Sequence, residues 1–127
     1  MPTPIEAVTT SALSAALDAA SRRHAVIAAN IANANSEGYA PLHLQFDQRV
    51  EEAREALQDQ QWLAAGGIDA LRGFVAPAAD VSEANTRTRL DAEMAELARN
   101  SVQFQALTQG LSRHLAMLAL AAADGKR

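Results

Sequence analysis

The chain has 127 residues, a formal charge of −4 and no cysteine. This length fits one domain or one elongated helical subunit, and the lack of cysteine excludes disulfides, thiolate metal sites and cysteine nucleophiles. The mild acidity provides no electrostatic footprint for nucleic acid. The longest apolar run, residues 115–123, is too short to span a bilayer, and residues 1–10 lack the pattern of a cleaved secretory signal.

The N-terminal part of the chain predicts a long helix over residues 3–34. Thr3 suits the N-cap, Pro4 suits the first helical position, and Glu6 stands three residues after Thr3, as a capping box requires. Apolar positions then recur at alternating steps of four and three residues, which predicts a coiled-coil seam. The seam is Leu13, Leu17, Ala20, His24, Ile27, Ile31 and Ala34. We interpret His24 as a packing residue on this seam.

The middle of the chain, residues 35–89, predicts a turn, a shorter helix and an irregular loop. Asn33, Asn35, Ser36 and Gly38 are residue types that end helices. Another four-three pattern predicts a short helix that runs to about residue 63. No helical period continues over residues 68–89, where short strands are expected near residues 74–75.

The C-terminal part of the chain predicts a second long helix over residues 90–123. Its four-three alternation continues for four heptads, with larger side chains than the N-terminal seam. This seam is Leu90, Met94, Leu97, Ser101, Phe104, Thr108, Leu111, Leu115 and Leu118.

Two long one-sided helices predict an all-α fold in which they form a coiled-coil-like antiparallel pair. Alanine accounts for 30 residues, so much of the apolar content favours helix but buries little surface. Because the apolar stripes are wide, a lone helix pair would leave apolar surface in water. The pattern therefore favours a component of an assembly, with residues 1–127 forming one subunit.

Side chains that carry chemistry form no recognisable catalytic, cofactor-binding or metal-binding pattern. The three histidines do not show metal-ligand spacing, and Asp91, Glu93 and Glu96 are better explained as a solvated first helical turn. We therefore expect no cofactor and no enzymatic activity.

Asn30 and Asn33 are unusual in an alanine-rich helix, because asparagine is a poor interior helix residue. One interpretation is local: the asparagines unwind the last turn, and Gly38 permits a reversal that packs Tyr39 back on the helix. The other interpretation is intermolecular, with both amides bridging to the backbone of a neighbouring subunit. The spacing alone leaves both open.

The segment from Asn30 to Asn33, followed by Ser36, Gly38 and Tyr39, resembles the N-I-A-N-x-x-T-x-G-Y signature of flagellar axial proteins. Residues 90–109 are similar to the proximal rod protein FlgB in particular. Together the two resemblances cover roughly residues 13–46 and 90–120. Ser36 replaces the usual threonine but keeps a hydroxyl, and Glu37 stands where proline is common, so the turn is expected to be less rigid.

This resemblance implies a structural subunit of the proximal rod in the bacterial flagellar basal body, in the periplasmic space, exported without a cleaved signal peptide. It implies torque transmission from rotor to distal rod and hook through helix packing. The implied partners are further copies, other flagellar rod proteins, the FliE adaptor and the flagellar export apparatus. The residues expected to form packing and turn contacts are Ile27, Asn30, Ile31, Asn33, Gly38, Tyr39, Leu97, Phe104, Leu111 and Leu118.

Two alternatives remain open at this point. The chain is also compatible with another short rod protein resembling FlgC, which shares the N-terminal motif. A cytosolic helical-hairpin adaptor that binds a partner helix would use the same heptads, but it would not be exported.

Overall fold

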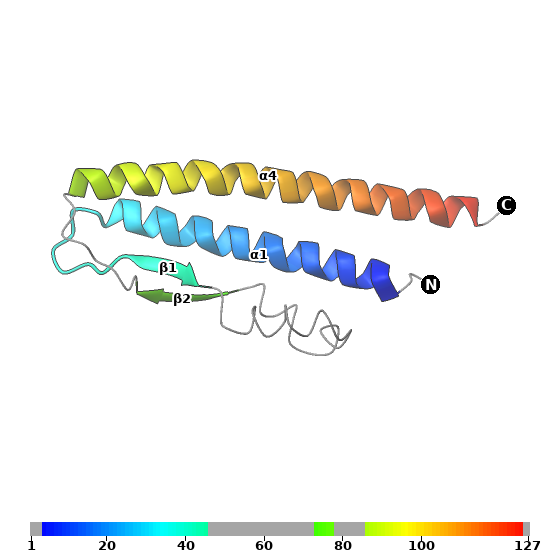
Figure 1. Cartoon of the computed structure of the whole chain (residues 1–127), viewed down its shortest axis with the longest axis horizontal. Helices are drawn as coiled ribbons and strands as arrows, with labels where there is room; N and C mark the ends of the chain where they lie inside the picture. The colour runs from blue at the N-terminus through cyan, green and yellow to red at the C-terminus, as the bar shows by residue number, and fades with distance from the viewer. Residues whose placement is uncertain (1–3, 46–72, 78–85, 126–127) are drawn as a thin grey trace.

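Two long helices lie side by side and run in opposite directions, so both chain ends are at the same end of the molecule (Figure 1). The computed structural model describes residues 4–45, 73–77 and 86–125. Within these residues, helix α1 spans Pro4–Ala32 and helix α4 spans Thr86–Asp124. Strand β1 (Leu42–Gln45) pairs with strand β2 (Phe74–Pro77), and β1 contacts α1.

The antiparallel helix pair confirms the main part of the predicted fold, but the all-α assignment was too narrow. The strand expected near residues 74–75 is present, and it forms a two-stranded sheet with β1, which the sequence analysis assigned to the turn and middle region. A strand of four residues is too short for its alternation to be distinctive. The predicted middle helix lies outside the described residues.

The core between α1 and its neighbours is made mainly of alanine. Ala15, Ala19 and Ala20 are almost completely buried, and Val26 and Ile27 complete the apolar part of this core among the described residues. No large side chain in the described part of the chain is fully buried. Small side chains allow two helices to approach closely, so packing here depends on close contact more than on buried area.

The buried face of α1 differs from the predicted seam. The buried positions are Ala15, Ala19, Ala20, Val26, Ile27 and Asn30. At about 100° per residue, their mean direction is rotated by roughly 90° from that of the predicted stripe. Ala20 and Ile27 of the predicted seam are buried, and Leu13, Leu17 and Ile31 are half-buried. His24 is exposed, so it is not a packing residue within this chain.

The contact face of α4 matches the predicted seam at every second position except Phe104, which is exposed. Leu90, Leu97, Leu111 and Leu118 are half-buried, as a seam requires. At the alternate positions the more buried residue is one earlier in the chain: Glu93 instead of Met94, Asn100 instead of Ser101, Leu107 instead of Thr108, and His114 instead of Leu115. Two of these four residues form side-chain hydrogen bonds with α1. Glu93 accepts from the Asn30 amide, and Asn100 donates to the Ala20 carbonyl oxygen. Polar contacts therefore determine which face of α4 is covered.

The two strands of the sheet pair antiparallel in one register. Leu42 pairs with Pro77 and Gln45 with Phe74. Gly73 precedes β2 with φ of +64°, and a Cβ atom there would lie 2.7 Å from the Gln45 carbonyl oxygen. Glycine is therefore required where the chain enters β2. Neither described helix is apolar over enough of its length to cross a membrane.

Enlarging a buried alanine of α1 should destabilise the chain. Ala19→Leu inserts three carbons where the side chain is 4% exposed, and overpacking of this kind costs about 1–3 kcal/mol. Ala25→Leu is the control, because Ala25 is exposed on the same helix and its replacement should change stability by less than about 0.5 kcal/mol. Urea unfolding followed by circular dichroism measures both. Equal stability of the two variants would show that Ala19 is not closely packed.

Candidate assembly site

The buried side chain of Asn30 joins four parts of the molecule. Its Nδ2 donates to the Leu42 carbonyl oxygen at 2.8 Å and to Glu93 Oε1 of α4 at 3.0 Å. Its Oδ1 accepts from the Leu42 N–H at 2.9 Å and from the Tyr39 hydroxyl at 3.1 Å. Asn30 is 4% exposed, so these bonds satisfy a side chain that has lost contact with water. α1, the turn, β1 and α4 are thereby held together by one amide.

Two further polar contacts align the antiparallel helices. Asn100, which is 3% exposed, donates through Nδ2 to the Ala20 carbonyl oxygen at 2.8 Å. Arg23 Nη1 donates to Gln103 Oε1 at 3.1 Å on the exposed side of the contact. With the Asn30–Glu93 bond, they fix the pair at two levels along its length, because the Asn100 and Arg23 bonds lie at the same level. Alanine contacts alone select register weakly because neighbouring registers present similar surfaces, whereas these hydrogen bonds fit one alignment.

The turn after α1 follows the local interpretation of the asparagine motif. Asn33 Nδ2 donates to the Ala29 carbonyl oxygen at 2.8 Å, and the Asn33 carbonyl oxygen accepts from the Ser36 N–H at 2.9 Å. Gly38 has φ of +74°, and the Tyr39 hydroxyl returns to Asn30. Both asparagine amides thus bond to backbone atoms of their own chain.

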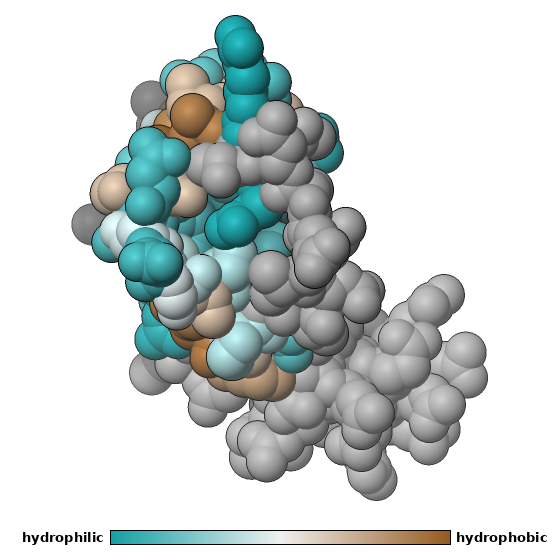
Figure 2. Space-filling view, turned by 90° about the vertical axis from the view of Figure 1, so that its left-hand side faces the viewer, coloured by the Kyte–Doolittle hydropathy of each residue, from teal (hydrophilic) through white to brown (hydrophobic). Residues whose placement is uncertain are grey.

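The end of the molecule that carries this turn is largely polar. Figure 2 views that end, and hydrophilic residues predominate among its coloured atoms. Asn35, Ser36 and Glu37 are exposed there. The large exposed apolar side chains of α4 occur along its length, at Met94, Val102, Phe104, Leu115, Met117 and Leu120. Apolar contact with other molecules is therefore favoured at the sides of the helices.

The residues expected to pack differ in how much of them the chain covers. Ile27 is buried, whereas Ile31, Leu97, Leu111 and Leu118 are half-buried. Phe104 remains 41% exposed although it lies at a seam position. These side chains are therefore shared between the helix contact and the outer surface.

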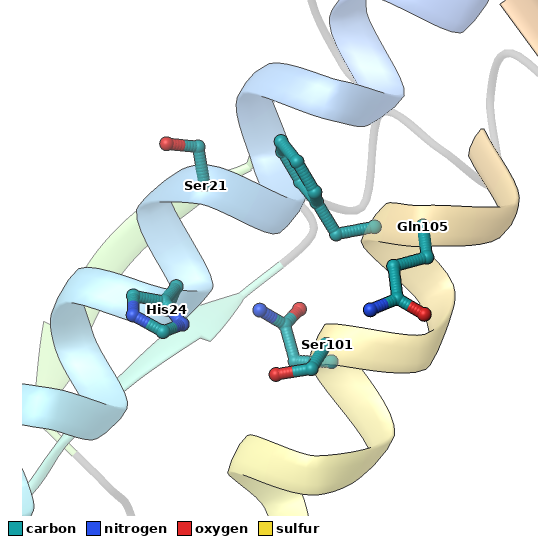
Figure 3. A pocket seen from close by; sticks show the side chains of 6 residues that line it. Ser21, His24, Ser101 and Gln105 are labelled. Atoms are coloured by element: carbon teal, nitrogen blue, oxygen red, sulfur yellow. The ribbon is translucent and has the colours of Figure 1, made fainter. Parts of the chain in front are cut away.

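A groove of about 340 Å³ lies between the helices beside Phe104. Ser21 and His24 line it from α1, while Ser101 and Gln105 line it from α4 (Figure 3). Asn100 and Phe104 also line it, and the buried Asn100 Oδ1 has no hydrogen-bond partner within the described ranges. The groove thus combines apolar surface with an unpaired acceptor.

This arrangement supports packing more than chemistry. Within residues 4–45, 73–77 and 86–125, no group of three or more acidic or histidine side chains converges in a metal-binding cluster. Glu93, which the sequence analysis assigned to a solvated first helical turn, lies beyond the first turn of α4 and accepts a hydrogen bond from Asn30.

The sequence analysis did not select Glu93, Asn100, Ala15 or Ala19 as packing residues. Apolar periodicity excludes the first two because they are polar, and alanine at every side of α1 conceals the positions of the last two. One signal in the sequence could have identified Asn100. Asparagine is disfavoured inside a helix, so its presence there, as at Asn30, indicates a structural role.

The family model described as flagella basal body rod protein matches residues 10–39. This segment contains most of α1 and the turn that ends at Tyr39. No curated protein and no solved structure gave a significant match to the chain. The match confirms the resemblance to the flagellar basal body rod proteins, which are structural components. It is a match to the family as a whole and identifies no single member of it.

Replacing Asn30 by aspartate should destabilise the fold strongly. The change removes two N–H donors and sets a second carboxylate beside Glu93, with an expected cost of about 3 kcal/mol. Asn35→Asp is the matched control, because Asn35 is exposed. Adding Glu93→Gln to the Asn30→Asp variant supplies a donor and should recover part of the loss, which a double-mutant cycle in urea measures. Additive effects would show that the two side chains do not interact.

Two glycine-to-alanine changes should have opposite signs. Gly38→Ala places a side chain at φ of +74° and should cost about 1 kcal/mol, although nothing lies within 4 Å of its Cβ position. Gly110→Ala also meets no atom within 4 Å, and in the middle of α4 it should stabilise by about 0.5–1 kcal/mol. Thermal unfolding of both variants compares them directly, and a shift in the same direction would contradict the left-handed turn at Gly38.

Proposed function

We propose that this chain is a structural subunit of the proximal rod in the bacterial flagellar basal body, and that it transmits torque through helix packing. The observation that carries the proposal is the family match over α1 and its turn. The proximal position, as in FlgB, is supported by the resemblance of residues 90–109 and by the short length of the sequence. Another short rod protein resembling FlgC is the nearest alternative.

Exposed apolar side chains support a role in assembly. Met117 is 61% exposed and Leu120 is 67% exposed near the end of α4, while Ile5 is 76% exposed near the start of α1. Both helices have these ends on the same side of the molecule (Figure 1). Burial of apolar surface is worth about 25 cal/mol per Å², so contact with further subunits stabilises these residues.

The internal contacts suit a part that carries mechanical load. Hydrogen bonds through Asn30, Asn100 and Arg23 resist sliding of α4 along α1, because sliding breaks several of them together. Alanine packing between them resists bending, since close-packed interiors are poorly compressible. Torque then passes through many packed atoms.

The proposed partners are further copies of this chain, other rod proteins, the FliE adaptor and the flagellar export apparatus. The proposed location is the periplasmic part of the basal body. A cytosolic helical-hairpin adaptor would bind a partner helix through the same exposed faces, but it would not require export through the flagellar apparatus.

Deletion of the gene, followed by electron microscopy of isolated basal bodies, tests the proposal. Cells that lack complete rods and are rescued by the intact gene would support it. Normal flagella in a host without a second copy would overturn it. A rod that is complete at its proximal end but arrested beyond it would favour a different position in the rod.

Introducing a charge at Phe104 should block assembly while leaving the subunit folded. Phe104 is 41% exposed, so the isolated chain tolerates the change, but an interface with a buried carboxylate would not form. Phe104→Asp should therefore abolish swimming in the deletion strain while the circular dichroism spectrum of the purified protein stays unchanged. Ser11→Asp, at an exposed position of α1, is the control and should restore swimming. Normal swimming with Phe104→Asp would remove this residue from the assembly contact.

A further inference from the structure

The groove lies on a continuous face of the helix pair that keeps coiled-coil spacing on both helices. Residues three, four and seven positions apart share one face of a helix, so the face extends from the groove residues in both directions. We call it the groove face. On α1 it comprises Thr10, Ser14, Leu17, Ser21, His24, Ala28 and Ile31, and on α4 it comprises Met94, Ala98, Ser101, Gln105, Thr108, Ser112 and Leu115.

Every residue of the groove face is exposed or half-buried. None is an aspartate, glutamate, lysine or arginine. A wide uncharged face with an alternating four-three period on two adjacent helices matches the surface that receives a third helix in a coiled coil. The occupant predicted by this spacing is therefore a helix.

α4 carries a second stripe with the same spacing on a different side. We call it the outer stripe. It comprises Ala95, Arg99, Val102, Ala106, Gln109, Arg113, Ala116 and Leu120, and all eight residues are exposed. Val102 and Leu120 are each 67% exposed, which is unusual for large apolar side chains. Alanine occupies three of the eight positions, which allows close approach to another helix.

The hydrogen-bonding groups of the two faces are complementary. The groove under this face is lined by Asn100, whose buried Oδ1 is an acceptor that lacks a donor among the residues that the structure describes. The outer stripe carries donors in Gln109 and Arg113. A buried amide oxygen without a partner is costly, so a donor that reaches it contributes to affinity and fixes the register.

We propose that the groove face of one copy receives the outer stripe of α4 from a second copy, with a side-chain donor of that stripe bound to Asn100 Oδ1. This proposal rests on the proposed function and names the partner of its assembly surface. The two faces differ, so the contact is heterologous: each copy has one groove face and one outer stripe to offer. Repetition of such a contact produces a ring or a helical array, in contrast to a closed two-fold dimer.

Single-cysteine variants test the pairing, since the native chain contains no cysteine. Gln105→Cys marks the groove face, and its sequence neighbour Ala106→Cys marks the outer stripe. Ala116→Cys marks the stripe on the other side of Gln109 and Arg113. Copies with different affinity tags are expressed together in the deletion strain, and disulfides are induced in isolated basal bodies. Ser36→Cys, on the polar turn, is the control.

The expected result is a mixed disulfide between Gln105→Cys and at least one outer-stripe variant. Its yield should be at least several-fold greater than that of either variant alone or of any pair containing Ser36→Cys. A larger yield with Gln105→Cys alone would indicate a two-fold contact and overturn the proposal.

Failure of this proposal is distinguishable from failure of the proposed function. If the variants restore swimming to the deletion strain but no mixed disulfide forms, the rod assignment holds and the groove contact is wrong. If deletion leaves normal flagella, the rod assignment itself fails. In that case the same disulfides, measured on purified variants at increasing concentration, still decide whether the two faces bind each other.

Discussion

The structure depends on the complete hydrogen bonding of one buried amide. Asn30 uses both of its donors and both acceptor positions, and each bond reaches a different group: the Leu42 carbonyl oxygen, the Leu42 N–H, the Tyr39 hydroxyl and the Glu93 carboxylate. The alanine core around it has little apolar area with which to select one arrangement. A satisfied polar network supplies that selection, because any other placement of the turn or of α4 leaves part of the amide unpaired. Asn30 therefore fixes the turn that follows α1, attaches β1 to α1 and aligns α4 with α1.

The presence and approximate length of the two helices were predictable because long periodic segments give strong signals. The turn over residues 33–38 was predictable from its residue types. The face that each helix buries was harder to predict. On α1, alanines occupy several sides, so the larger residues Leu13, Leu17 and Ile31 dominated the predicted stripe although they lie beside the contact. On α4, the choice between Asn100 and Ser101 depends on a carbonyl group of Ala20 that is remote in sequence. Apolar periodicity detects the spacing of large apolar side chains, and it contains no information on such a hydrogen bond.

The difference between predicted and observed seams has a physical meaning. The residues that apolar periodicity selected on the two helices, such as Leu17 and Met94, include several that the isolated chain leaves exposed or half-buried. The pattern in the sequence therefore includes more apolar positions than the contacts within one copy use. Polar residues align the two helices, and apolar residues at heptad spacing remain exposed, which agrees with the match of residues 10–39 to the family model of the flagellar basal body rod proteins.

The small size of the buried side chains also determines how the subunit responds to temperature. The heat capacity of unfolding increases with the apolar area that becomes exposed, and alanine contacts at Ala15, Ala19 and Ala20 hide little of it. The free energy of unfolding of this helix pair therefore changes slowly between cold and warm conditions, because its curvature is set by that heat capacity. In the proposed assembly, contacts between copies bury larger apolar residues and follow a steeper curve. Cooling is then expected to weaken these contacts before it affects the helix pair within each copy.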